Sequence, residues 1–247
     1  MKSFSVLTVS KRTGWEELAV ESINAQTVVM EPIRWFIVHE EPWNYKEGVF
    51  ADLNVGWNPV KAPPKLRLSN LNASLNAGLR LIDTDYVIFY QDFIKLAPDC
   101  FEKLLDLVNE RTFVTTCTPN YDGTDDGRYT GLAGPRACRP EEWETNVAVA
   151  PLKALQELGG FDEEYDNGWS WDNVNVAQRA AMLGYRFLLD ESNRPQLLPH
   201  EQKDKETLPL NMERHSRTIK MIRSGQKPLK LNYLQNGNSK TDKRERG

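Results

Sequence analysis

Apolar positions along the chain follow two spacings, one typical of buried strands and one typical of helices. Short, strongly apolar runs predict strands at residues 4–10, 33–39, 86–90, 112–118, 146–150, 185–189 and 196–200. Apolar residues three or four positions apart predict helices at residues 15–23, 71–82, 98–109, 151–158, 172–183 and 212–223. Because the first strands alternate with helices, we expect right-handed crossovers and parallel pairing. The sequence therefore predicts an α/β fold with a mixed, mainly parallel sheet flanked by helices in a single domain.

Two stretches follow neither spacing and are expected to be loops. Residues 41–66 are rich in Pro, Gly, Trp and Asn, which predicts a long surface loop. Residues 119–140 hold four Gly and three Pro, and a structureless loop of this length inside a domain usually has a function. Size and pattern together predict one domain at residues 1–216 and a basic tail at residues 217–247.

Charge is divided unevenly between these two parts. The formal net charge of the 247 residues is −4 at pH 7, but residues 217–247 hold nine Lys or Arg and two acidic residues, a net charge of +7. That leaves −11 for residues 1–216. Three interpretations stay open: a tail that is helical at first and then disordered, a tail that docks on its own acidic body, and a tail that weakly binds a polyanion.

Several protein classes are disfavoured by what the sequence lacks. No apolar run approaches ~18 residues, so no membrane span is expected. The first residues lead straight into a strand and do not resemble a signal peptide. Three cysteines without metal-site spacing fit a reducing compartment, which predicts a cytoplasmic protein.

A carboxylate follows the strand predicted at residues 86–90. The polar pair Gln91-Asp92 comes directly after this apolar run, and a helix begins soon after it. In open α/β sheets, ligands bind beyond the carboxyl ends of the strands. The placement therefore makes Asp92 a candidate ligand-binding residue, and the alternative is that it caps a turn.

Residues 159–187, GGFDEEYDNGWSWDNVNVAQRAAMLGYRF, carry a resemblance to a known family. The stretch resembles the acceptor-side region of family 2 glycosyltransferases of the GT-A fold. It resembles the beta-1,4-galactosyltransferases more closely, with their Gly-Gly-Phe, Gly-Trp-Gly-Gly-Glu-Asp, Arg and Gly-Tyr pattern. The blocks VLTVSKRTGWEELAVESINAQ, LNASLNAGLRLIDTDYVIFYQDFIKLAPDCFEKL and NVAVAPLKALQELGGFDE occur in the matching order. The similarity covers roughly residues 4–200.

The resemblance implies a nucleotide-sugar donor, expected to be a UDP-sugar, bound with Mn²⁺ or Mg²⁺. The family's Asp-x-Asp motif falls on Gln91-Asp92-Phe93, which keeps a carboxylate only at the middle position. Asp92 is therefore the expected metal ligand. His200, in LLPHEQKD, stands where galactosyltransferases place a metal-binding histidine and is the second expected ligand. The family's usual outcome, inversion at the transferred sugar, is expected here too.

The general base is expected at Asp172. The family's Glu-Asp pair maps onto Asp172-Asn173, and an amide such as that of Asn173 cannot accept a proton at neutral pH. The alternative is that Asp172 is simply the N-cap of the helix at residues 172–183. Trp169 and Trp171 are expected to stack on sugar rings, with Asn173 also in the acceptor site.

The remaining donor contacts are expected after the first strands. The nucleotide is expected at the carboxyl ends of the parallel strands. The expected contacts are Thr8, Ser10 and Arg12 after the first strand, Glu40 after the second, and Asp92 after the strand at residues 86–90. The resemblance adds Arg67 and Asn76, which lie in the block that normally contacts the base and diphosphate.

Three functions are compatible with these features. The leading hypothesis is transfer of one sugar to a glycan or small-molecule hydroxyl. A second is transfer to hydroxymethylated bases of phage-type DNA, which the basic tail would hold and the enzyme would flip out of the stack. A third is a non-catalytic nucleotide-sugar or glycan-binding protein, because the outer motif aspartates and the second catalytic carboxylate are missing.

Overall fold

A computed structural model describes residues 2–10, 12, 14–28, 34–40, 48–119, 124, 127–168, 170–199 and 207–234. Its main sheet has eight strands in the order β3-β2-β1-β4-β8-β6-β9-β7. These strands are β1 (Phe4–Ser10), β2 (Arg34–His39), β3 (Gly56–Lys61), β4 (Tyr86–Tyr90), β6 (Thr112–Thr116), β7 (Pro135–Ala137), β8 (Val147–Pro151) and β9 (Arg186–Asp190). Pairing is parallel from β3 through β4 and between β6 and β9, and antiparallel where β8 and β7 join.

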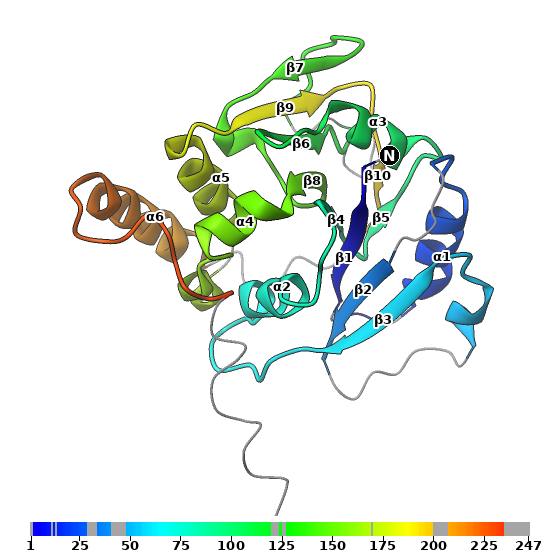
Figure 1. Cartoon of the computed structure of the whole chain (residues 1–247), viewed down its shortest axis with the longest axis horizontal. Helices are drawn as coiled ribbons and strands as arrows, with labels where there is room; N and C mark the ends of the chain where they lie inside the picture. The colour runs from blue at the N-terminus through cyan, green and yellow to red at the C-terminus, as the bar shows by residue number, and fades with distance from the viewer. Residues whose placement is uncertain are drawn as a thin grey trace, which may run out of the picture.

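Helices cover both faces of this sheet (Figure 1). They are α1 (Glu16–Asn24), α2 (Leu71–Leu79), α3 (Cys100–Leu107), α4 (Leu152–Leu158), α5 (Asp172–Met182) and α6 (Leu208–Arg223). Three short 3-10 turns are η1 (Val49–Asp52), η2 (Pro140–Glu142) and η3 (Glu163–Asn167), and β5 (Ile94–Lys95) pairs with β10 (Gln196–Leu197) in a small second sheet. This arrangement confirms the predicted mixed, mainly parallel sheet flanked by helices.

The alternation of side chains along each strand divides the core into two clusters. Val6 and Ile88 face the side covered by α1 and α3, where Trp35 and Phe101 are buried. Leu7, their neighbour in sequence, faces the side covered by α2, α4 and α5. Because both faces are packed, the central strands read as nearly continuous apolar runs, which is why their positions can be predicted from sequence.

Both predicted loops contain a strand, so each prediction was wrong in part. Within 41–66, β3 forms the edge of the sheet and pairs in parallel with β2. Its Pro59 lacks an N–H group and is tolerated at an edge strand, and only Val60 of β3 is buried, so the strand has no apolar pattern. Within 119–140, the short β7 pairs with β9.

Charged contacts organise the second of these stretches. The buried Glu191 carboxylate accepts hydrogen bonds from the Thr130 backbone and hydroxyl at 2.9 and 2.7 Å, from the Leu132 backbone at 3.1 Å and from Arg136 Nε at 2.6 Å. Burial opposes ionisation, but these donors lower the pKa of Glu191 to about 2. A buried carboxylate therefore fixes a segment that hydrophobic patterning alone does not specify.

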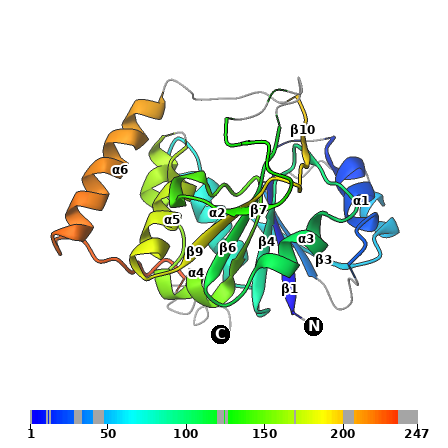
Figure 2. The same ribbon diagram turned by 90° about the horizontal axis from the view of Figure 1, so that it is seen from above.

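The chain after the main body packs against it instead of extending away. α6 lies beside α4 and α5 at the margin of the molecule, as Figures 1 and 2 show, and it contacts η3. The predicted domain boundary at 216/217 falls inside this helix. No helix in the described part of the chain is long and apolar enough to cross a membrane.

Basic residues after α6 form ion pairs with the acidic body. Lys227 Nζ lies 2.9 Å from an Asp162 carboxylate oxygen and 3.5 Å from one of Glu164. Lys230 Nζ lies 2.9 Å from Glu157. These contacts favour the docking interpretation for residues 227–234, and residues 235–247 lie outside the described part of the chain.

Candidate active site

The carboxyl ends of three parallel strands bring some of the predicted donor residues together. β1 and β2 pair in parallel, so Ser10 and His39 lie side by side at their carboxyl ends. β4 runs parallel to β1 and leads into Gln91 and Asp92. The Gln91 backbone N–H donates to the Asn146 carbonyl at 3.0 Å, which joins the end of β4 to the residues before β8.

Asp92 is buried at these strand ends and is bound by two of the other predicted residues. Ser10 Oγ donates to one carboxylate oxygen of Asp92 at 2.8 Å, and the Arg12 guanidinium forms an ion pair with the other. The Asp92 side chain is 1% exposed and that of Arg12 is 39% exposed. Arg12 also lies over the Phe93 ring, 4.9 Å from its centroid. Ser10, Arg12 and Asp92 therefore form one cluster whose cation, Arg12, reaches solvent.

The described residues of this cluster do not fit a divalent cation. Asp92 supplies the one carboxylate of the Ser10, Arg12 and Asp92 cluster, and a metal ion bound there would meet the positive charge of Arg12 at close range. No group of three or more His, Cys, Asp or Glu side chains suited to a metal occurs among the described residues. His200, the second predicted ligand, lies outside the described residues, so a metal shared by Asp92 and His200 stays a prediction.

Asp172 lies at the start of α5, and burial changes its protonation. Trp171 occupies the N-cap position, so Asp172 is the first helical residue and not the cap itself. Burial is the largest influence and raises the pKa of Asp172 from 3.8 to about 6, while backbone N–H groups of residues 172 and 173 partly oppose this. The negative charges of Asp166 and Glu144 raise the pKa further. A carboxylate with a pKa near 6 suits a general base at neutral pH.

The turn that presents Asp172 holds two residues in a strained conformation. Ser170 and Trp171 have φ angles of +64° and +72°, and they are the two non-glycine residues with positive φ in the described chain. This left-handed conformation costs about 1–3 kcal/mol for each residue and persists only where surrounding contacts enforce it. Such strain clusters at functional sites, which makes this turn, described at residues 168 and 170–172, a candidate for one.

Contacts connect the start of α5 with the strand end that carries Asp92. The Asn173 side-chain amide donates to the Trp143 carbonyl at 2.9 Å. Asn146 donates to Glu144 at 3.1 Å, and its own carbonyl accepts from Gln91. Residues 143–146 therefore connect the start of α5 with the segment that carries Asp92. The Asn173 side-chain amide is one of the donors in this connection.

Asp166, which the sequence analysis did not single out, organises the N-terminus of α2. Its carboxylate accepts from the backbone N–H groups of Asn72 and Ala73 at 2.9 and 3.1 Å, from Asn72 Nδ2 at 3.0 Å and from Ser69 Oγ at 3.1 Å. A carboxylate at this end also complements the helix dipole. These partners lie more than 90 positions away in the chain, so no local pattern identifies the interaction.

The other predicted donor residues lie in less accessible or more distant positions. Thr8 is fully buried in the core and accepts from Trp35 Nε1 at 2.9 Å. Asn76 is also fully buried, where its amide bonds both backbone groups of Phe161 at 2.9 Å. Glu40 and Arg67 are exposed, and Arg67 donates to the Glu163 carbonyl. The structure does not bring Thr8 or Asn76 to the surface of the Asp92 cluster.

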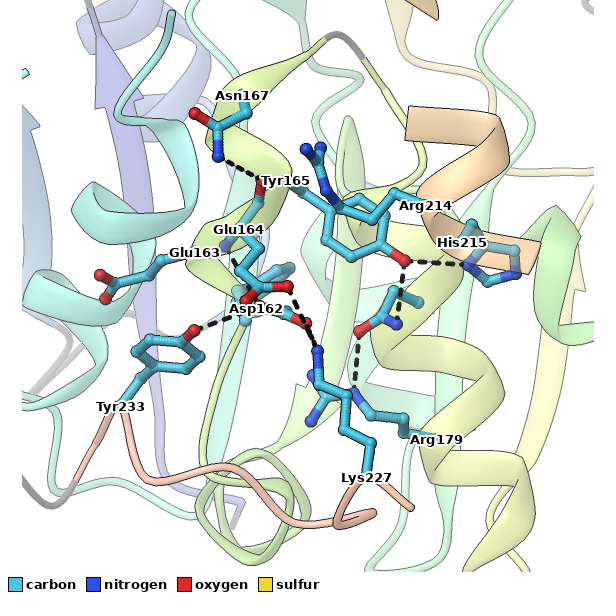
Figure 3. Close-up of polar contacts among 12 residues, drawn as sticks. Asp162, Glu163, Glu164, Tyr165, Asn167, Arg179, Arg214, His215, Lys227 and Tyr233 are labelled. Carbon is cyan, nitrogen blue, oxygen red and sulfur yellow. Dashed lines mark hydrogen bonds and ion pairs between the residues drawn. The ribbon is translucent and has the colours of Figure 1, made fainter. Parts of the chain in front are cut away.

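The aromatic residues predicted for the acceptor site are only partly described. Trp171 is described, and its ring packs against the tilted ring of His215 on α6, with centroids 5.0 Å apart and an interplanar angle of 37°. Trp169 lies outside the described residues, so its predicted role in sugar stacking stays a prediction. Burial lowers the pKa of His215. The Nδ1 atom of His215 lies 3.3 Å from the Tyr165 hydroxyl oxygen, and Figure 3 shows the two side chains facing each other.

Comparison with known proteins identifies similar folds and no sequence relatives. No protein-family model matches the chain, and no curated protein matches its sequence. Among solved structures, S. aureus TarS is 12% identical, with a TM-score of 0.59 over 90% of this chain. GalNAc-T7 with UDP, GalNAc and Mn²⁺ is 12% identical, with a TM-score of 0.63 over 88% of this chain. The mannosyltransferase PcManGT from Pyrobaculum calidifontis, in complex with GDP-Man and Mn²⁺, is 15% identical, with a TM-score of 0.63 over 96%.

These likenesses confirm the GT-A fold that the sequence predicts. The chain spans 39% of TarS, 48% of GalNAc-T7 and 71% of PcManGT. The Asp92 cluster and the strained turn with Asp172 are the candidate functional groups on this fold.

Proposed function

We propose that this protein is a glycosyltransferase that moves a sugar from a nucleotide-sugar donor to an acceptor hydroxyl. The observation that carries the proposal is Asp172, a buried carboxylate with a pKa of about 6 at a strained turn. Contacts through residues 143–146 connect this turn to the end of β4. Proteins with similar structures bind UDP with GalNAc, UDP-GlcNAc or GDP-Man, which supports a sugar nucleotide as the donor. A UDP-sugar is the first donor to test.

In the proposed reaction Asp172 acts as the base. Its carboxylate accepts the proton of the acceptor hydroxyl, and the oxygen forms a bond to the anomeric carbon of the donor sugar. The bond between that carbon and the diphosphate oxygen breaks, and the nucleoside diphosphate leaves with the electron pair. A single displacement of this kind inverts the anomeric centre.

Arg12 supplies the positive charge near the leaving group. The diphosphate gains negative charge as the bond breaks, so a cation placed there stabilises the transition state. Arg12 is held by Asp92 and stays partly exposed, which leaves its remaining N–H groups available to a phosphate oxygen. Because the described residues do not fit a divalent cation, we assign no step to one.

Calorimetric titration of nucleotide sugars tests donor binding. We expect UDP-sugar binding in EDTA and a loss of at least about tenfold in affinity for Arg12→Gln, the scale of a charge-assisted hydrogen bond. Arg34→Gln is the matched control, because Arg34 is exposed and forms an ion pair with Asp83. Binding that requires Mn²⁺ and is unchanged in Arg12→Gln would instead support the metal predicted at Asp92 and His200.

Release of nucleoside diphosphate then distinguishes a transferase from a binding protein. We expect release to accelerate with a hydroxyl acceptor, and a screen should include glycans, small sugars and hydroxymethylated DNA. The pairing of Lys227 and Lys230 with carboxylates of the body makes the DNA arm the least favoured. Saturable donor binding without any release of nucleoside diphosphate, even by slow hydrolysis, would contradict an enzymatic function.

A further inference from the structure

The turn that presents Asp172 is held by α6, a helix that follows it in the chain and contains none of the predicted site residues. Asn211 is fully buried on α6, and its side-chain amide donates to the Tyr165 and Ser170 carbonyls at 2.9 Å each. Arg214 donates in turn to the Asn211 side-chain oxygen. One amide of α6 therefore fixes the carbonyl of a strained residue two positions before Asp172.

A second contact lies one turn further along α6. The His215 ring packs against Trp171, the other strained residue, and its Nδ1 lies 3.3 Å from the Tyr165 hydroxyl oxygen. Residues four positions apart on a helix lie on one face, so Asn211 and His215 act together on the turn. Figure 3 shows His215 projecting from α6 toward Tyr165 of η3.

The chain after α6 fastens this helix to the same part of the body. Lys227 and Tyr233 both contact the buried carboxylate of Asp162 (Figure 3). The Lys227 Nζ and the Tyr233 hydroxyl oxygen lie 2.9 and 3.2 Å from its oxygens. The Leu231 backbone N–H donates to the Leu158 carbonyl at 2.8 Å. Asp162 directly precedes η3. Both α6 and the residues that follow it therefore contact the region that leads into the turn.

Gly168 shows how closely Asn211 approaches the turn. A Cβ atom added at Gly168 would lie 2.8 Å from the Asn211 side chain, closer than real carbon contacts allow. Gly168 has an extended backbone with φ of −165°, which alanine also adopts without strain. Alanine at this position would therefore act mainly by pushing the Asn211 amide away from its two carbonyl partners.

We propose that α6 is a clamp on the turn described at residues 168 and 170–172, and that Asn211 is a positioning residue for Asp172. The clamp holds Ser170 and Trp171 in their strained conformation, and this conformation aims the Asp172 carboxylate at the acceptor. The proposal deepens the proposed function, on which its catalytic part rests. The clamp does not involve Ser10, Arg12 or Asp92, so donor binding is independent of it.

Two variants and one control test the clamp. In Asn211→Ala and in Gly168→Ala we expect kcat to fall about 10–100-fold, the cost of misplacing a catalytic group by about 1 Å, with the donor KM unchanged. The double variant should lose little more than Asn211→Ala alone, because alanine at 211 removes the clash with residue 168. Ile219→Val, a mild change at a buried residue further along α6, should keep the wild-type kcat.

Backbone hydrogen exchange tests the same clamp and does not depend on enzyme activity. The Asn175 backbone N–H donates to the Trp171 carbonyl at 3.0 Å, so its exchange reports whether the turn and first helical residues stay in place. We expect faster exchange at residues 172–175 in Asn211→Ala and Gly168→Ala and not in Ile219→Val. Exchange that is unchanged, or equally raised by the control, overturns the clamp. If exchange rises selectively but wild-type protein transfers no sugar, the clamp stands and the proposed function fails.

Discussion

Replacing Asp172 by Asn should stabilise the protein at neutral pH while removing the proposed base. Burial raises the pKa of Asp172 from 3.8 to about 6, so the folded state resists ionisation of this carboxyl group. A folded-state pKa above the unfolded value favours folding below pH 4, and this advantage is lost as pH rises through about 6. The Asn variant has no proton to lose at this position and keeps its stability over that range.

The expected size follows from the two pKa values. The difference between 3.8 and about 6 corresponds to an upper bound of about 3 kcal/mol, at about 1.4 kcal/mol for each pH unit. The free energy of unfolding of Asp172→Asn, relative to wild type, should therefore increase by up to about 3 kcal/mol between pH 4 and pH 7. For a chain of 247 residues, this is about 6–12 °C in Tm.

Urea unfolding followed by tryptophan fluorescence at a series of pH values measures this difference. Differences between the pH values cancel any contribution of the amide that does not depend on pH. Asp106→Asn, at an exposed position on α3, is the matched control and should show a flat difference. A stability difference between Asp172→Asn and wild type that stays constant from pH 4 to pH 7, or that shrinks, would refute the raised pKa of the buried Asp172 carboxyl group.

Two further substitutions test the supporting contacts. Gly159→Ala should lower the free energy of unfolding by at least about 1–2 kcal/mol in urea titrations, because Gly159 has φ of +74° and its Cβ would lie 1.6 Å from the Leu231 carbonyl oxygen; wild-type stability would mean that residues 227–234 do not dock there. Asp166→Asn should lower it by about 2–3 kcal/mol, because an amide cannot accept both backbone N–H groups of α2, and a loss no larger than that of Asp106→Asn would speak against this cap.

The sequence identifies elements whose burial is local and regular. The apolar runs of β1 and β4 match their predicted bounds because both faces of these strands are packed. β3 was missed because only one of its residues is buried and Pro59 suggests a loop. β7 was missed because a buried carboxylate, Glu191, fixes its surroundings.

The candidate site shows the same limit. The sequence and its family resemblance proposed Asp92 and Asp172 as site residues, and contacts through residues 143–146 connect the segments that carry them. The resemblance also pointed to Asn76, which the structure shows to be buried as a tie between α2 and Phe161. Asp166 and Asn211 could not be predicted from the sequence, because their hydrogen-bond partners are distant in the chain and no spacing marks them.

Nucleoside diphosphate release by wild type and Asp172→Asn tests the central claim most directly. Both proteins should bind the donor with equal affinity in calorimetric titrations. Wild-type release in the presence of acceptor should rise with pH through about 6 and then level off, since only the ionised carboxylate accepts a proton. Asp172→Asn should release nucleoside diphosphate on the order of 10²–10⁴-fold more slowly. Release within a factor of a few of wild type, with the same pH profile, would contradict the assignment of Asp172 as the base.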